Sequence, residues 1–194
     1  MIVIFGGAFN PPTIAHDEVA RHLLALPTVE KLVFVPVGDH YEKPDLIPAD
    51  HRVKMLEIMV EKLPDTSVSK IEVEAQRALK TIETLERFQV ESPEAEFAFV
   101  MGADNLSKLR NWYAYERLIH SFKMIIVNRG ELDIHAFIEK HFSHLSHQFL
   151  IIEDFDKVDI SSSQYRADVT KTELLLPQIE KYIKEKGLYQ GNFD

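Results

Sequence analysis

Short apolar runs alternate along the chain with longer segments in which apolar residues recur every three or four positions. The short runs are typical of strands that are buried on both faces, and the longer segments are typical of amphipathic helices. The predicted strands are Met1–Phe5, Lys31–Pro36, Ser67–Val73, Glu96–Met101, Phe122–Val127 and Gln148–Ile152. The predicted helices are His16–Ala25, Ala49–Leu63, Thr81–Gln89, Trp112–His120 and Ile134–Ser146.

This alternation of strand and helix predicts an α/β fold, with an open, mostly parallel, doubly wound sheet covered by helices on both faces. After Asp159 the pattern predicts no strand. Leu174–Lys186 is predicted to be a closing helix that Gly187 ends, which gives the chain a helical C-terminal end. Because no repeat, low-complexity tract or linker interrupts the pattern, we expect residues 1–194 to form a single domain.

Charge and composition narrow the classes of function. The chain has 22 basic and 31 acidic residues, a formal charge of −9, so its field repels nucleic acids and acidic membranes. It has no cysteine, which excludes disulfides, thiolate metal sites and cysteine nucleophiles. The N-terminal segment does not resemble a targeting peptide, and no apolar window is long enough to span a membrane. We therefore expect a cytoplasmic protein with neither nucleic-acid nor membrane partners.

The loop after the first predicted strand is suited to phosphate. It reads Gly6-Gly7-Ala8-Phe9-Asn10-Pro11-Pro12-Thr13-Ile14-Ala15-His16. Paired glycines let the backbone approach a ligand, and the helix that follows offers N–H groups and partial positive charge. Thr13 and His16 share one face of its first turn and can donate hydrogen bonds to phosphate oxygens. The loop has neither a Walker A motif nor a dinucleotide fingerprint; the structural alternative is a tight turn.

A second motif makes the first one specific. The first loop resembles the Gly-x-Phe-x-Pro…(His/Thr)-x-x-His signature of the nucleotidyltransferase superfamily, and Ile160-Ser161-Ser162-Ser163-Gln164-Tyr165-Arg166 resembles its second signature. Within the superfamily, nearly the whole chain is similar to the nicotinate- and nicotinamide-nucleotide adenylyltransferases. The segment Met101–Leu106, followed by Trp112 and Glu116, resembles the middle of that family. The resemblance implies a Rossmann-like nucleotidyltransferase fold.

The resemblance also implies a reaction. The 5′-phosphate of a pyridine mononucleotide attacks the α-phosphorus of ATP, releases pyrophosphate and forms a dinucleotide for NAD biosynthesis. A phosphate monoester has its second pKa near ~6, so the nucleophile is mostly dianionic at neutral pH and needs no general base. Positioning and electrostatic stabilisation would carry the catalysis. The expected partners are ATP and the mononucleotide, and Mg²⁺ is expected to arrive with ATP.

The candidate site residues follow from the two motifs, from the positions of charged residues after predicted strands, and from the resemblance. The expected catalytic residues are His16, Thr13 and Arg166. The expected ATP-binding residues are Gly6, Gly7, Ala8, Phe9, Thr13, His16, Gly102, Asp104, Arg129, Ile160, Ser161, Ser162, Ser163 and Arg166. The expected mononucleotide-binding residues are Asn10, Lys43, Thr81, Thr84 and Trp112, with the Trp112 ring stacking on the pyridine. No residue is expected to be a metal ligand.

Several alternatives stay open from the sequence. Lys80 replaces a tyrosine that is usual in bacterial members, and residues 39–43 differ from the usual Pro-Pro-His-Lys, so the choice between nicotinate and nicotinamide mononucleotide is undecided. A phosphopantetheine adenylyltransferase and a catalytically silent nucleotide-binding protein are the competing functions. His141, His144 and His147 fan widely around a helix and are expected to be a helix face rather than a metal site. The oligomeric state, a homo-oligomer included, is also open.

Overall fold

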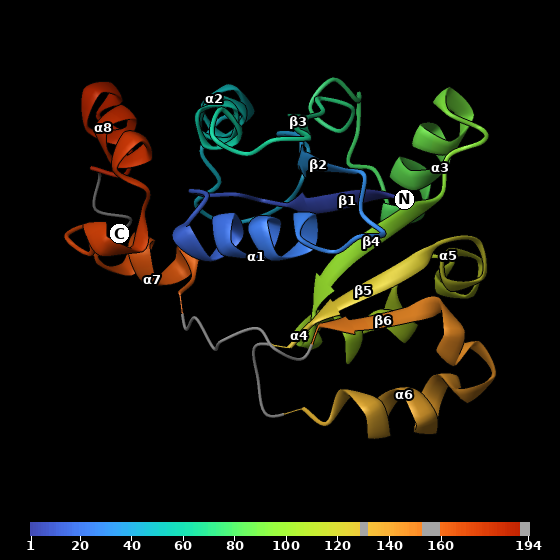
Figure 1. Cartoon of the computed structure of the whole chain (residues 1–194). Coiled ribbons are helices and arrows are strands. Elements are labelled where there is room, and N and C mark those ends of the chain that lie inside the picture. Colours follow the sequence, from blue (N-terminus) through green and yellow to red (C-terminus); the bar gives the residue numbers. More distant parts are fainter. Residues whose placement is uncertain (129–131, 153–159, 191–194) are drawn as a thin grey trace.

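The computed structural model describes residues 1–128, 132–152 and 160–190, and it contains one six-stranded sheet. Its strands are β1 (Ile2–Gly7), β2 (Lys31–Pro36), β3 (Thr66–Val68), β4 (Phe97–Gly102), β5 (Lys123–Val127) and β6 (Phe149–Ile152). The order across the sheet is β3-β2-β1-β4-β5-β6, and every neighbouring pair is parallel. The predicted open, parallel, doubly wound sheet is therefore confirmed (Figure 1).

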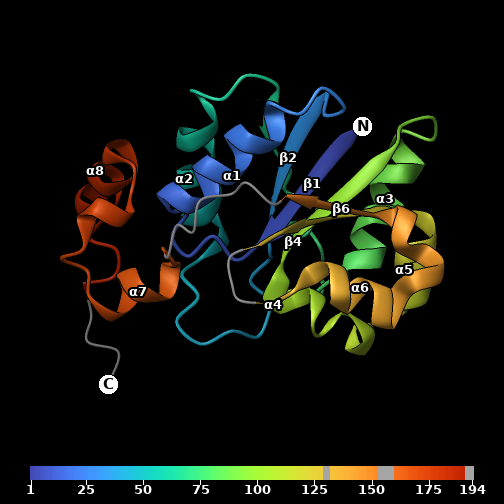
Figure 2. The same cartoon turned by 60° about the horizontal axis from the view of Figure 1, so that its bottom comes forward.

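Helices cover both faces of the sheet. They are α1 (Ile14–Leu24), α2 (Ala49–Val60), α3 (Thr81–Glu91), α4 (Ala103–Leu106), α5 (Tyr115–Ser121), α6 (Ile134–Phe142), α7 (Ser162–Ala167) and α8 (Pro177–Lys186). Short 3₁₀ helices are formed by Leu109–Asn111, Ser143–Gln148 and Thr172–Leu174. Helices α1 and α2 lie over one face, with α8 packed against α2, and α3, α5 and α6 lie over the other (Figures 1 and 2).

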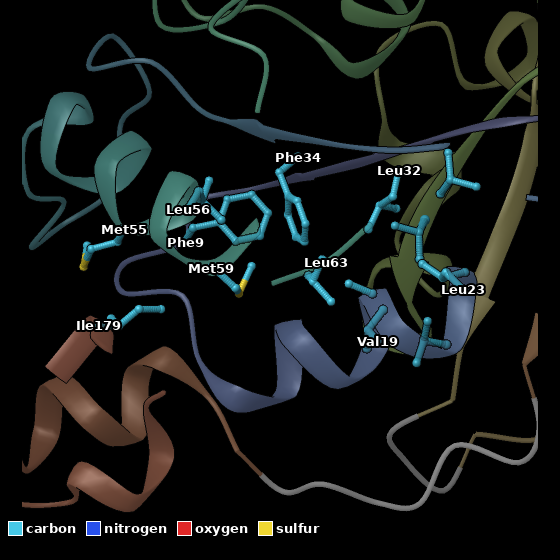
Figure 3. Packing of buried hydrophobic residues seen from close by; sticks show 14 of the residues in the cluster. Phe9, Val19, Leu23, Leu32, Phe34, Met55, Leu56, Met59, Leu63 and Ile179 are labelled. Atoms are coloured by element: carbon cyan, nitrogen blue, oxygen red, sulfur yellow. The ribbon is translucent and has the colours of Figure 1, made fainter. Parts of the chain in front are cut away.

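Alternation along the strands divides the core in two. Val3 packs among the side chains of α1 and α2, whereas its neighbour Ile4 packs among those of α3, α5 and α6. Figure 3 shows the first of these cores, where Phe34 of β2 meets Phe9 of the first loop and Leu56 of α2. Because both faces of the sheet are buried, the strands read as nearly continuous apolar runs.

Several predicted element boundaries need correction. The strand predicted over Ser67–Val73 ends at Val68, where pairing with β2 stops, and Ile71 packs on the opposite core. The helix predicted over Trp112–His120 begins only at Tyr115, because Ala114 adopts a left-handed conformation with φ of 50°. The helix predicted over Ile134–Ser146 ends at Phe142 and continues as a 3₁₀ helix.

The C-terminal part is helical, as predicted. Helix α8 begins at Pro177 rather than at Leu174, since proline lacks the N–H that an interior position needs and is favoured in the first turn. Gly187, with φ of 61°, ends α8 as expected. Helices α7 and α8 lie together beyond the first turn of α1 (Figure 1). No helix in the described residues is both long and apolar enough to cross a membrane.

The strand order reverses beside β1. The chain places β2 and β3 on one side of β1, then returns to place β4, β5 and β6 on the other. In open parallel sheets this reversal leaves a crevice at the carboxyl ends of the two central strands. The loops after β1 and β4 are therefore the expected walls of a binding site.

Candidate active site

A cleft of about 1240 Å³ opens where this reversal predicts it, at the carboxyl ends of β1 and β4. It is lined by residues of the loops after β1, β2 and β4 and by the start of α3. Nine of the residues predicted from the sequence lie on its wall: Gly6, Gly7, Ala8, His16, Lys43, Thr81, Gly102, Asp104 and Trp112. The cleft thus brings together residues that are far apart in the sequence.

Close packing leaves little room for a side chain at the two glycines that end β1. A Cβ on Gly6 would lie 3.1 Å from the ring of Phe99, and one on Gly7 would lie 3.1 Å from the ring of Phe9. Phe9 has φ of 47°, an uncommon conformation for a bulky residue, and its ring is buried. The sequence prediction placed Phe9 in the nucleotide site; the structure places its side chain in the core below the loop.

His16 is held in a fixed orientation on the wall of the cleft. The backbone N–H of Thr13 donates to its Nδ1 over 3.0 Å, and the Thr13 hydroxyl lies 2.8 Å from the same nitrogen. The edge-on ring of Phe9 packs against the imidazole, with centroids 5.2 Å apart. Because Nδ1 accepts a hydrogen bond from a backbone N–H, the proton of the neutral ring lies on Nε2.

Several predicted contact residues do not line the cleft: Phe9, Asn10, Thr13, Thr84, Ile160, Ser161, Ser162, Ser163 and Arg166. Three of them are polar residues buried in the interior. Thr13 is completely buried beneath His16, and Asn10 is 1% exposed. Thr84 is also buried, and its hydroxyl donates to the Glu72 carboxylate over 2.6 Å. Their polar groups are therefore engaged inside the protein, where they hold other parts of the site.

The second motif is anchored on the first. Ser161 caps α7, since its hydroxyl accepts from the N–H of Gln164. The hydroxyl of Ser162 donates to the carbonyl of Pro11 over 2.8 Å, and Nη1 of Arg166 donates to the carbonyl of Asn10 over 2.9 Å. The two motifs, far apart in the sequence, therefore meet at the first loop.

The remaining residues of the second motif have structural partners here. The Ser163 hydroxyl accepts a hydrogen bond from Nη2 of Arg166, and Ile160 packs against the core. Nε of Arg166 is buried and has no hydrogen-bond partner within the described part of the chain. Arg129, the other predicted cation of the site, lies outside the described residues.

A buried arginine that the sequence prediction missed holds the loop between β2 and α2. The Arg52 guanidinium is fully buried and donates to the carbonyls of Ala8, Val37 and Ile47 and to the Asp39 carboxylate. It therefore ties the loop after β1 to the loop after β2. An arginine on the otherwise apolar face of a predicted helix was the available signal.

Positive charge gathers beside this loop. Burial lowers the pKa of Lys43, and the nearby charges of Arg166 and Arg52 lower it further. Two arginines close enough to affect Lys43 form with it a local positive region in a chain of net charge −9. Such a region attracts a polyanion.

Another part of the cleft wall is aromatic and contains the start of α3. Trp112 lies edge-on to Phe99, with ring centroids 6.1 Å apart, and Thr81 is the first residue of α3. Glu72 and Tyr113, which the sequence prediction missed, also line this region. Burial raises the pKa of the Glu72 carboxyl, while its hydrogen bond from Thr84 acts in the opposite direction.

At the end of β4, Asp104 contributes an exposed carboxylate to the wall. A Cβ on Gly102 would lie only 2.5 Å from Oδ1 of Asp104, so the carboxylate folds back over the glycine. Asp104 stands in the first turn of the short helix α4. Among the described residues, no group of three His, Cys, Asp or Glu side chains could hold a metal ion.

The comparisons with known proteins agree with this architecture. The Cytidylyltransferase-like family model matches residues 4–168. A probable nicotinate-nucleotide adenylyltransferase of Caldicellulosiruptor bescii is 32% identical over 97% of this chain and 98% of its own length. The nicotinate-nucleotide adenylyltransferase of Bacillus subtilis is 26% identical over 98% of both chains.

Solved structures share the fold. The Plasmodium falciparum nicotinic acid mononucleotide adenylyltransferase complexed with NaAD superposes with a TM-score of 0.78 at 21% identity, over 100% of this chain and 98% of that one. A putative nicotinate-nucleotide adenylyltransferase of Vibrio parahaemolyticus superposes with a TM-score of 0.70 at 19% identity, over 98% and 96%. The chain therefore belongs to the nicotinate-nucleotide adenylyltransferase family of cytidylyltransferase-like proteins.

Proposed function

We propose that this protein joins ATP to nicotinate mononucleotide, forming nicotinate adenine dinucleotide and pyrophosphate in NAD biosynthesis. The relatives from Caldicellulosiruptor bescii and Bacillus subtilis are named for this activity, and this chain matches them over almost their whole length. The observation in the fold that best supports the proposal is the fixed imidazole of His16 on the wall of a cleft at the carboxyl ends of β1 and β4.

The reaction requires no nucleophile from the protein. A 5′-phosphate oxygen of the mononucleotide forms a bond to the α-phosphorus of ATP, and the bond from that phosphorus to the bridging oxygen breaks. Pyrophosphate leaves with the electron pair. Since the attacking phosphate is mostly dianionic at neutral pH, the site must align the two anions and stabilise the charge on the leaving group.

His16 is the residue assigned to the reacting phosphates. With Nδ1 accepting from Thr13, the Nε2–H is the ring's donor, and a donor stabilises negative charge that grows on phosphate oxygens. Thr13 acts through His16, because its hydroxyl is buried against the ring instead of facing the cleft. This replaces the expectation that Thr13 itself contacts ATP.

Arg166 and Lys43 would counter the charge of the two anions. Lys43 lies on the wall of the cleft and is assigned to a substrate phosphate. In this conformation two guanidinium nitrogens of Arg166 bind Asn10 and Ser163, so Arg166 contributes through its charge and through its hold on the first loop. The start of α7, from Ile160 to Ser163, is assigned to the ATP side.

Mg²⁺ is expected to enter with ATP. Magnesium keeps several waters and is commonly held by one or two carboxylates together with substrate phosphates. The cleft offers the exposed carboxylate of Asp104, which suits such a partial donor set. Bound Mg²⁺ would neutralise phosphate charge; the protein residues would align the substrates around it.

The end of the cleft between Trp112 and Thr81 is assigned to the pyridine ring. An indole offers a flat apolar surface for stacking. The start of α3 provides backbone N–H groups and partial positive charge, which favour a carboxylate over a carboxamide. This is the physical reason to propose nicotinate rather than nicotinamide mononucleotide as the preferred acceptor.

The test is an acceptor comparison. The protein is incubated with ATP and Mg²⁺ and, separately, with nicotinate mononucleotide, nicotinamide mononucleotide or phosphopantetheine, and both pyrophosphate and the adenylylated product are measured. We expect the highest kcat/KM with nicotinate mononucleotide. Product with phosphopantetheine alone, or none with any acceptor, overturns the proposal. A higher kcat/KM with nicotinamide mononucleotide overturns the acid preference and leaves the reaction type in place.

A further inference from the structure

Asn10 joins three separate parts of the chain around the nucleotide loop. Its Nδ2 donates to the carbonyl of Asp45 over 2.6 Å, and its Oδ1 accepts from the hydroxyl of Tyr189 over 2.8 Å. The N–H of Ile47 reaches the same oxygen at the longer distance of 3.4 Å. The carbonyl of Asn10 accepts from Arg166. The Asn10 side chain is thus held by the loop after β2 and by the turn after α8, and its carbonyl is held by α7, in a residue that is 1% exposed.

The turn after α8 brings Tyr189 to this position. Gly187 reverses the chain, and the N–H of Leu188 returns to the carbonyl of Ile183. Tyr189 itself has φ of 61°, a conformation that non-glycine residues keep only when their surroundings impose it. Its ring stands edge-on to the ring of Tyr165 in α7, with centroids 5.8 Å apart. The phenol is therefore directed towards Asn10 by backbone and by packing.

The hydroxyl, as distinct from the ring, makes one specific contact. The ring belongs to the apolar core, where phenylalanine would fill the same space. Burial raises the pKa of the Tyr189 phenol well above its ordinary value, so the hydroxyl keeps its proton and remains a donor. Its bond to Asn10 is the shorter of the two that Oδ1 accepts.

We propose that Tyr189 is a positioning residue of the nucleotide site, whose hydroxyl fixes Asn10 and thereby sets the places of Lys43 and Arg166. Asp45 and Ile47 follow Lys43 closely in the loop between β2 and α2, so the Asn10 side chain holds the part of the loop that carries this cation. The Asn10 carbonyl holds the guanidinium of Arg166. Tyr189 itself is absent from the wall of the cleft.

This inference rests on the proposed function, because it assigns Tyr189 to the alignment of ATP and its acceptor. It predicts a distinct kinetic effect. Removing the hydroxyl leaves every group that faces the cleft in the protein, yet loosens Asn10, which holds both the loop that carries Lys43 and the guanidinium of Arg166. We therefore expect the affinity for ATP to fall clearly while the melting temperature changes little.

The test compares Tyr189→Phe with Tyr165→Phe. Both variants lose one phenolic hydroxyl from the same edge-on aromatic pair, but only Tyr189 donates to the nucleotide loop. For Tyr189→Phe we expect kcat/KM for ATP to fall by about fivefold or more, mainly through KM, the size that corresponds to one buried hydrogen bond. For Tyr165→Phe we expect kinetic constants within about twofold of wild type. Melting temperatures are measured for both.

The outcomes separate this inference from the proposed function. If wild type makes no dinucleotide, the proposed function fails, and calorimetric ATP affinity of wild type and Tyr189→Phe then decides the positioning role. Unchanged ATP affinity and KM in Tyr189→Phe overturn it, as does an equal loss in both variants that follows their melting temperatures. If Tyr189→Phe does not fold, Asn10→Asp, which lacks the donor to Asp45, takes its place; wild-type KM in that variant overturns the inference.

Discussion

The Thr13 hydroxyl lies 2.8 Å from Nδ1 of His16, and the N–H of the same residue donates to that nitrogen. One residue at the start of α1 therefore sets both the orientation and the tautomer of the imidazole. The backbone bond alone is enough to make Nδ1 an acceptor; the hydroxyl adds a second restraint on the ring angle. This division allows the two contributions to be separated by substitution.

Replacing Thr13 tests the second restraint. In Thr13→Val the shape and the backbone bond remain while the hydroxyl is lost, so we expect kcat to fall by about tenfold with little change in KM for ATP. Thr13→Ser keeps the hydroxyl and should retain most of kcat. Steady-state kinetics on both variants check this, and equal kcat values for Val and Ser would show that the backbone bond suffices.

Removing the imidazole itself should have the larger effect. For His16→Ala we expect kcat to fall by on the order of 10²-fold or more, as when a donor to developing negative charge is lost. His144 is exposed on the 3₁₀ helix after α6, outside the cleft, so His144→Ala is the matched control and should leave kcat unchanged. A kcat for His16→Ala close to that of the control removes His16 from its assigned role.

Lys43 predicts a pH dependence of substrate binding. Because burial and two neighbouring arginines lower its pKa, the ammonium loses its proton at a lower pH than an ordinary lysine does. Only the charged form attracts phosphate, so kcat/KM for ATP should decline as pH rises towards this lowered pKa. In Lys43→Arg the charge persists, and the decline should be absent. Activity profiles from about pH 7 to about pH 10 make the comparison.

The lowered pKa of Lys43 has the opposite effect on the stability of the fold, which should increase as pH rises. The unfolded chain binds the Lys43 proton more tightly than the folded chain does, so this residue makes the free energy of unfolding rise with pH between the two pKa values. Relative to Lys43→Met, wild type should therefore gain stability across the alkaline range. Urea unfolding of both proteins measures the difference, and a gain as the pH is lowered would contradict it.

Replacing Glu72 by glutamine should stabilise the fold. Burial raises the pKa of its carboxyl, so the folded protein is penalised for ionising it as pH rises above the ordinary value. Glu72→Gln removes the charge and keeps an oxygen that can accept from Thr84. We expect the variant to melt higher than wild type at neutral pH and at the same temperature near about pH 4. A melting temperature lowered equally at both pH values would contradict the prediction.

Gly38 should not tolerate a methyl group. A Cβ there would lie 2.3 Å from the carbonyl oxygen of Glu72, and backbone cannot move aside as a flexible side chain can. Gly38→Ala is expected to lower the free energy of unfolding by about 1–3 kcal/mol, as other overpacked sites do. Gly6→Ala, which would approach the Phe99 ring at 3.1 Å, should cost less. Chemical denaturation ranks the two variants.

The sequence predicted what depends on local pattern. The apolar run Lys31–Pro36 is the observed β2, and Gly187 ends α8 where expected. The strand predicted as far as Val73 failed because Ile71 is apolar for a different reason: it packs in the core on the far face of the sheet, outside any strand. Periodicity cannot distinguish a loop residue that is buried from a strand residue that is buried.

The same distinction between local pattern and long-range contacts applies to the candidate site. Each motif lies at the start of a helix, and the two meet where Arg166 of α7 binds the carbonyl of Asn10, a few residues before His16. The burial of Asn10 and Thr13 and the role of Arg52 depend on contacts between segments that no local pattern reveals. Tyr189 meets Asn10 across 179 positions, and no sequence pattern near either residue predicts this contact.

That long separation sets an order of events during synthesis. Once β6 has emerged from the ribosome, every strand of the sheet is free to pair, but Asn10 still lacks both Arg166 and Tyr189. Domains that fold on the ribosome do so as their partners emerge, and contacts between remote segments form late. A nascent chain would thus assemble its sheet first, and the contacts of Asn10 with α7 and with the turn after α8 would form only once α8 has emerged and folded back.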